Sequence, residues 1–195
     1  MVSLIELLLM KKIYILIFFF AAHFFSNSKV ISNDTIHWNA LKPLTWSDFK
    51  GDAIDSSSLN GDIVIEILAT SKKGSRFAST STNVVTVFDW RNSWVKPKSE
   101  SEVFLKYFQV IFDITEVYSR KLRKSIKEAD LDPYPVSFEE KYNASKIGLK
   151  DRIKQFKKES KVGTYEIAIT RWTDNIKAEL TELEAFKQTF PKSNK

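Results

Sequence analysis

Residues 102–122, Glu-Val-Phe-Leu-Lys-Tyr-Phe-Gln-Val-Ile-Phe-Asp-Ile-Thr-Glu-Val-Tyr-Ser-Arg-Lys-Leu, decide the fold. Apolar side chains recur in this stretch at intervals of three and four residues, as they do on one face of a helix. A second apolar stripe is formed by Val103, Val110, Ile114 and Val117. Because a helix that is apolar on two sides must be covered by other elements, the pattern predicts a buried central helix. Ser99 and Glu102 have the spacing of a capping box at its start, and Pro133 and Pro135 are expected to end it.

The residues before this helix predict strands. Residues 63–68 and 84–88 are rich in β-branched and aliphatic side chains and are bounded by glycine or polar turn residues. Such runs are typical of strands. We expect an antiparallel hairpin joined by a loop over residues 72–82, preceded by a packed, irregular segment at residues 36–51.

The residues after the central helix predict two further helices. Ser137 and Glu140 have the spacing of a capping box, and Gly163 is expected to cap the end of the helix that they begin. This helix is expected to run through Tyr142, Ile147, Ile153 and Phe156. The third helix should bury Tyr165, Ile169, Trp172, Ile176, Leu180 and Leu183. Strands followed by helices indicate an α+β fold, with a small N-terminal antiparallel sheet packed on the central helix.

Composition excludes several classes of chemistry. The 195 residues contain no cysteine and only two histidines, at positions 23 and 37. Disulfides, thiolate catalysis and cysteine-ligated metals are therefore excluded. Catalytic zinc sites in proteins usually use two or three imidazoles, so a conventional histidine-ligated zinc site is not expected. His37 is the one histidine outside the N-terminal apolar run, and we interpret it as a packed or surface residue rather than a general base.

The N-terminus has the layout of an export signal. Two lysines follow Met10, residues 13–25 form an apolar run interrupted only by His23, and residues 26–28 are small or polar. This order is typical of a secretory signal peptide, and the run is shorter than the roughly 20 residues of a membrane span. We predict a signal peptide at residues 1–28, with Met10 as an alternative start, and one domain at residues 29–195 in the periplasm or outside the cell. An uncleaved N-terminal anchor is the alternative.

Four short motifs, in order, resemble a bacterial family of secreted zinc-dependent proteases, domain-of-unknown-function family nine-twenty-two. Residues 105–116 resemble the family's His-Glu-Gln-x-His-Phe-Asp-Ile motif and the Glu that follows it. Residues 44–51 are similar to its Leu-Thr-Trp-x-Asp-Phe-x-Gly segment, and residues 93–95 match its Ser-Trp-Val. Residues 156–172 resemble its closing segment, in which a His-Gly pair precedes a Trp by nine residues. The resemblance covers roughly residues 36–185 and implies a zincin-like fold.

The resemblance also implies where zinc would bind, and those positions have changed. In a His-Glu-x-x-His helix the two histidines bind Zn²⁺ and the glutamate is the general base. Here Tyr107 and Ile111 stand at the histidine positions, Phe108 stands at the glutamate, and Val162 stands at the third presumed ligand. The framework residues that match the family are Trp46, Asp48, Phe49, Trp94, Asp113, Glu116, Arg120, Gly163 and Trp172. The ability to bind zinc is therefore expected to be lost, with neither catalytic residues nor a cofactor remaining.

These residues favour an exported, non-catalytic relative of the protease family that acts as a binding or scaffolding domain. The alternative is a secreted or periplasmic hydrolase that uses another mechanism. Asp113 and Glu116 are three residues apart and can be interpreted as an acid–base pair, but a structural role, with a salt bridge from Glu116 to Arg120, is the preferred interpretation. Serine and lysine are plentiful, yet no local motif indicates a nucleophile.

Residues 120–161 carry the positive charge of the chain. This stretch holds 13 Lys and Arg against 7 Asp and Glu, and the whole chain has a net charge of +6. Such a basic face is suited to anionic lipid, an anionic cell-wall polymer or an acidic envelope protein. A solvated helix surface is the alternative. Nucleic acid is not an expected partner, because no stacking or groove-binding motif is present.

Overall fold

The structure is a computed structural model that describes residues 34–72, 81–129 and 136–188. The described residues belong to one compact unit, Ile31–Lys195. The predicted signal peptide at residues 1–28 and the alternative start at Met10 lie outside the described residues.

An antiparallel hairpin forms the centre of the larger sheet. Strand β3 (Ile65–Lys72) pairs with β4 (Ser81–Asp89), and the short β1 (Thr35–His37) adds to the opposite edge of β4, so the strand order is β1-β4-β3. The register places Ile65 opposite Phe88. A second, two-stranded sheet pairs β2 (Gly61–Asp62) with β5 (Trp94–Val95). The predicted hairpin is therefore confirmed, while part of its connecting loop lies outside the described residues.

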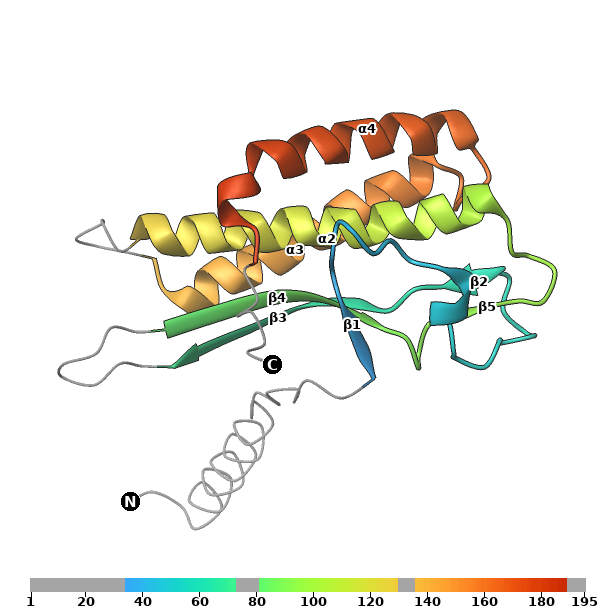
Figure 1. The fold of residues 1–195 in the computed structure, drawn as a ribbon, viewed down its shortest axis with the longest axis horizontal. Helices are drawn as coiled ribbons and strands as arrows, with labels where there is room; N and C mark the ends of the chain where they lie inside the picture. The colour runs from blue at the N-terminus through green and yellow to red at the C-terminus, as the bar shows by residue number, and fades with distance from the viewer. Residues whose placement is uncertain (1–33, 73–80, 130–135, 189–195) are drawn as a thin grey trace, which may run out of the picture. The chain divides into compact units, whose positions relative to one another are not determined.

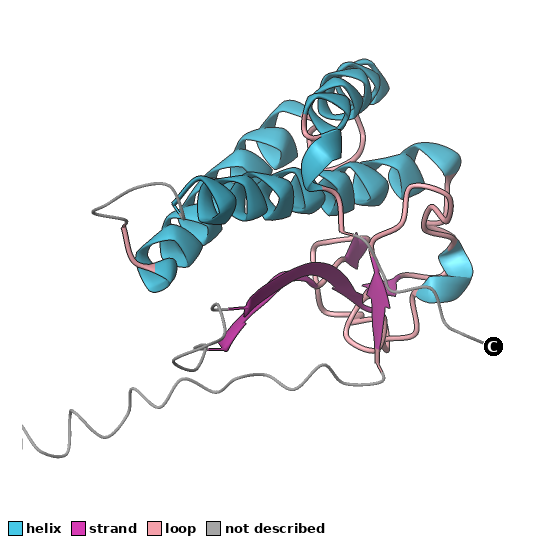
Figure 2. Ribbon diagram, turned by 60° about the vertical axis from the view of Figure 1, so that its left-hand side comes forward, coloured by secondary structure: helices cyan, strands magenta, loops and turns pink. Residues whose placement is uncertain are grey.

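The central helix α2 (Glu102–Ala129) packs on the larger sheet and contributes more buried apolar side chains to the core than any other element. Figure 2 shows the helices gathered on one side of the strands. The N-terminal capping residue differs from the prediction. The helix begins at Glu102, and the backbone N–H of Phe104 donates to the hydroxyl of Ser101 at 3.1 Å. The prediction of Ser99 as the capping residue was wrong because Glu102 is itself the first helical residue.

Two further helices flank α2, as predicted. Helix α3 (Phe138–Glu159) begins at the predicted capping box of Ser137 and Glu140. Helix α4 (Glu166–Glu182) runs beside α2 on the side away from the sheet (Figure 1) and is followed by a short 3₁₀ helix, η2 (Glu184–Phe186). Another 3₁₀ helix, η1 (Trp46–Asp48), lies in the N-terminal segment. These elements confirm the α+β class.

Two details of the flanking helices, the end of α3 and the place of Tyr165, differ from the prediction. Helix α3 ends at Glu159 with Ser160 as its C-cap, three residues before Gly163. Ile147 is 64% exposed, and Tyr165, the residue before α4, is 41% exposed. Apolar character alone did not distinguish the packed side of α3 from its solvent side. No described helix is long and apolar enough to span a membrane.

Candidate functional site

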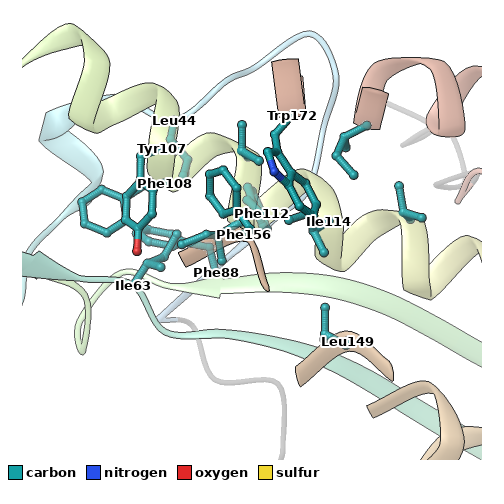
Figure 3. Packing of buried hydrophobic residues seen from close by; sticks show 14 of the residues in the cluster. Leu44, Ile63, Phe88, Tyr107, Phe108, Phe112, Ile114, Leu149, Phe156 and Trp172 are labelled. Carbon is teal, nitrogen blue, oxygen red and sulfur yellow. The ribbon is translucent and has the colours of Figure 1, made fainter. Parts of the chain in front are cut away.

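The three positions on α2 at which the resemblance would place two zinc ligands and a base lie inside the hydrophobic core. Tyr107 and Ile111 are one turn apart on α2, with Phe108 beside them, and each side chain is no more than 2% exposed. Figure 3 shows Tyr107 and Phe108 among the packed rings of the core. Their burial follows from the apolar stripe that the sequence places on this side of the helix.

Aromatic rings fill the space around these positions. The ring of Tyr107 stacks on Phe104 and on Phe156, with centroids 5.7 and 5.3 Å apart. Phe108 contacts Phe104 at 4.6 Å and Phe49 at 5.1 Å. Such tilted and offset pairs stabilise a core beyond the area that they bury. The cluster is therefore part of the hydrophobic core, and the hydroxyl of Tyr107 brings a polar group into it.

Burial has an electrostatic consequence for Tyr107. Removal of water raises the pKa of its hydroxyl, and the nearby carboxylate of Asp62 raises it further. The phenol therefore stays protonated at neutral pH, and a protonated phenol is a poor metal ligand. Because Ile111 and Phe108 have no donor atoms, the residues present do not fit a zinc ion. Among the described residues, no three His, Cys, Asp or Glu side chains converge as metal ligands do.

The connection between α3 and α4 brings the fourth position near this cluster, but its side chain is exposed. An ideal Cβ on Gly163 would lie 2.6 Å from Cδ2 of Phe104 and 3.1 Å from Cδ1 of Tyr107, so the backbone of Gly163 lies against α2. Val162 is 44% exposed. The backbone of the loop therefore lies against α2 at Tyr107, while the Val162 side chain is partly exposed to solvent.

Three consecutive residues of this connection have positive φ angles. The values are 48° at Lys161, 52° at Val162 and 89° at Gly163. The carbonyl oxygen of Ser160 accepts hydrogen bonds from the N–H groups of residues 163, 164 and 165, at 3.0–3.1 Å. These bonds hold the loop in a conformation that a β-branched residue rarely adopts.

The aromatic framework residues pack around the same cluster. Trp46 meets Phe108 edge-on at 6.2 Å, and Phe49 meets Phe88 at 5.2 Å. Asp48 accepts a hydrogen bond from the N–H of Thr45 at 2.7 Å, which caps η1. Trp94 on β5 is 6% exposed.

Trp172 joins the last two helices. Its ring lies 5.3 Å from that of Phe156, and its indole N–H donates to Glu159 at 2.7 Å. The indole N–H is thereby satisfied at the rim of the core, which is the usual arrangement for a buried tryptophan.

Asp113 and Glu116 have structural partners. Asp113 accepts hydrogen bonds from the indole N–H of Trp38 at 2.7 Å and from the amide of Gln109 at 2.8 Å. Burial raises the pKa of Asp113, and these two donors oppose the rise. The Gln109 side-chain oxygen accepts in turn from the N–H of Leu44. The N-terminal segment is therefore tied to α2 through this carboxylate.

Glu116 is the centre of a buried ionic cluster. It is 2% exposed and accepts from Nε of Arg120 at 3.0 Å, from Arg123 at 3.1 Å and from the hydroxyl of Thr86 at 2.7 Å. Arg120 also donates to the carbonyl oxygen of Leu180 at 2.6 Å. The predicted salt bridge from Glu116 to Arg120 is confirmed. Both carboxylate oxygens of Glu116 are bonded to neighbouring side chains in the buried interior.

Sequence reasoning missed part of this cluster. The sequence did not distinguish Arg123 from the other basic residues near the end of the helix. Thr86 lies in an otherwise apolar strand, and no pattern in the sequence indicated that it contacts Glu116. His37, weighed as a general base, lies on β1 opposite Val87.

Comparison with known proteins returned no match, whether against protein-family models, curated proteins or solved structures.

Proposed function

We propose that this chain is a non-catalytic relative of the secreted zinc-dependent proteases, with a zincin-like fold that serves as an exported binding or scaffolding domain. One observation carries the proposal. The positions that match the family's ligands and base on α2 are occupied by side chains that form the closely packed centre of the core. A site that bound zinc would need donor atoms and room for a water molecule at this place.

The framework residues support the same proposal. Glycine at position 163 is required by the close approach of its backbone to Phe104 and Tyr107, whatever the chemistry of the site. Glu116 and Arg120 join α2 to the sheet and to the C-terminal end of α4. These residues stabilise the fold independently of catalysis. They can therefore be retained in a relative that has lost the zinc ligands.

The first test is the zinc content of the purified protein after dialysis, measured by elemental analysis. We expect far less than one zinc per chain. Stoichiometric zinc that resists dialysis would contradict the proposal and favour an enzyme.

A sharper test restores the ligands. The variant Tyr107→His, Phe108→Glu and Ile111→His should take up zinc at micromolar concentrations, because two histidines four residues apart lie on one face of α2. Its matched control carries Phe112→His in place of Ile111→His. A five-residue spacing turns the second imidazole away from the first, so the control should bind weakly. If the restored variant folds, by circular dichroism, and binds no more zinc than the control, the proposed relationship is wrong.

A further inference from the structure

The solvent side of α3 carries a row of lysines. Lys150, Lys154 and Lys158 follow one another at four-residue intervals and are all exposed. Residues four apart on a helix lie on adjacent turns of one face, so the three ammonium groups form a row about 12 Å long. Lys146 is exposed one turn before the row, and Lys161 is exposed just beyond the end of the helix.

Few acidic groups neutralise this row. Within the described residues, no ion pair is formed by Lys150, Lys154 or Lys158, although Lys157 beside them lies 3.9 Å from Asp62. Two of the four carboxylates of α3 are bonded to other groups. Glu140 is bonded to Ser137 in the capping box, and Glu159 is bonded to Arg171 and Trp172. Asp151 is the exposed acid that remains beside the row.

Apolar side chains accompany the lysines. Ile147 precedes Lys150 by three residues on the same face and is 64% exposed. At the other end, Val162 follows Lys161 and is 44% exposed, and the ring of Tyr165 lies 5.2 Å from the Lys161 ammonium group. We call residues 146, 147, 150, 154, 158 and 161 the lysine face.

We propose that the lysine face of α3 binds the surface of an anionic phospholipid bilayer. Lysines are attracted to the negative surface potential of such a bilayer. Exposed aliphatic side chains gain from transfer into the boundary between headgroups and acyl chains, whereas a soluble polyanion offers them no apolar environment. The combination of uncompensated lysines with Ile147 therefore favours lipid over a dissolved acidic polymer.

This inference rests on the proposed function in one respect, namely that the domain acts by binding. The residues of the lysine face on α3 take no part in the core at Tyr107, so the zinc measurements and the lipid measurements can fail separately.

The test uses the full chain and sedimentation with vesicles of phosphatidylcholine alone or with about 30% phosphatidylglycerol. The measured quantity is the ratio of the two partition coefficients, so an apolar contribution common to both vesicles cancels. We expect Lys150→Gln, Lys154→Gln and Lys158→Gln together to lower this ratio about 100-fold, because each lysine near an anionic surface contributes about fivefold. The wild-type preference should also weaken steeply as salt is raised.

A matched control removes the same charge elsewhere. Lys42, Lys50 and Lys177 are exposed and lie outside α3, and their joint replacement by Gln should change the ratio only a few-fold. The proposal is overturned if the wild type does not prefer anionic vesicles, or if both triple variants lose binding equally.

Ile147→Ser separates lipid from a soluble polyanion. It should weaken binding to anionic vesicles about tenfold, since it removes an apolar group from the bilayer boundary, and should leave binding to inorganic polyphosphate unchanged. Unchanged vesicle binding by Ile147→Ser, together with polyphosphate binding as tight as that to vesicles, would identify a dissolved polyanion as the partner and overturn the proposal.

Discussion

Val162 has a left-handed backbone although its side chain is β-branched. Its φ angle is 52°, and its N–H donates to the carbonyl oxygen of Lys157 at 2.9 Å. A left-handed conformation costs an L-residue other than glycine about 1–2 kcal/mol, and the exposed side chain recovers little of this by burial. The strain is therefore local to position 162 and can be relieved there.

Val162→Gly is expected to stabilise the protein by about 0.5–1 kcal/mol. Glycine adopts positive φ without strain, and the greater freedom of glycine in the unfolded chain offsets part of the gain. Urea denaturation measures the change in the free energy of unfolding. Thr164→Gly, in the same loop at a residue without a positive φ, is the control and should destabilise.

Asp113 makes the stability of the protein depend on pH. Its pKa is raised by burial above the ordinary value of 3.8, so its carboxyl binds protons more tightly in the folded state than in the unfolded state. The destabilisation caused by its charge is complete above the folded pKa and is lost as the pH falls toward the unfolded value. Glu116 nearby raises the pKa and Arg120 lowers it.

Asp113→Asn is therefore expected to be more stable than the wild type at pH 7, with an advantage that disappears by about pH 4. The amide oxygen of asparagine can still accept from Trp38 and Gln109. Denaturation curves at several pH values measure this difference. Asp113→Ala, which removes the acceptor, should be less stable than the wild type at pH 7, and an Asn variant that behaves like it would contradict the argument.

At the scale of elements, the packing of α4 and α3 on α2 depends on a glycine in their connection. Gly163 has a φ angle of 89° and its backbone lies against Phe104 and Tyr107, both of which are buried. A side chain at this position would have to displace two packed rings. The connection reaches α2 only because this residue lacks a Cβ.

Gly163→Ala should destabilise the protein by about 3 kcal/mol, since overpacking of a core costs about 1–3 kcal/mol and the left-handed backbone adds about 1–2. Thermal and urea denaturation measure the loss. Gly148→Ala is the matched control. Its Cβ would meet the Tyr118 ring at 2.7 Å, but that ring is only partly buried and can move. A smaller loss at position 163 than at position 148 would show that this account of the loop is wrong.

At the scale of the whole molecule, the Glu116 cluster connects parts of the chain that are far apart in sequence. Thr86 comes from β4, and Arg120 and Arg123 come from α2. The carbonyl acceptors for the two arginines belong to Val84, Leu180 and Phe186. The two charges nearest Glu116 are positive, and Arg120 is also bonded to Glu184. Loss of the central carboxylate would remove the buried counterion that Arg120 and Arg123 share, and would leave Arg120 with the exposed Glu184.

Glu116→Gln is expected to lower the free energy of unfolding by about 3 kcal/mol, the usual loss when one partner of a buried ion pair is removed. The control is Glu102→Gln, which breaks the exposed pair with Lys106 at the same i,i+4 spacing and should cost less than about 0.5 kcal/mol. Equal losses in the two variants would mean that Glu116 has no special role in joining the elements.

Local regularities of the sequence predicted the elements of this fold. The apolar period of residues 102–122 predicted α2, and the capping box at Ser137 predicted the start of α3, because hydrogen bonding and side-chain spacing within a helix involve near neighbours. The strands of the hairpin and the α+β class follow from the same kind of pattern. The positions of Tyr107, Phe108 and Ile111 on one buried helix also follow from this apolar period.

Only the tertiary structure decided how distant residues meet. It placed Thr86 and Arg123 on Glu116, joined Trp38 to Asp113, and left Ile147 and Val162 exposed. Contacts between residues far apart in the chain produce no periodic pattern in the sequence. The residues around an isoleucine in the sequence also do not show whether another element covers its side chain. The structure also placed the loop of Gly163 against α2, with positive φ angles that are held by hydrogen bonds of the folded loop.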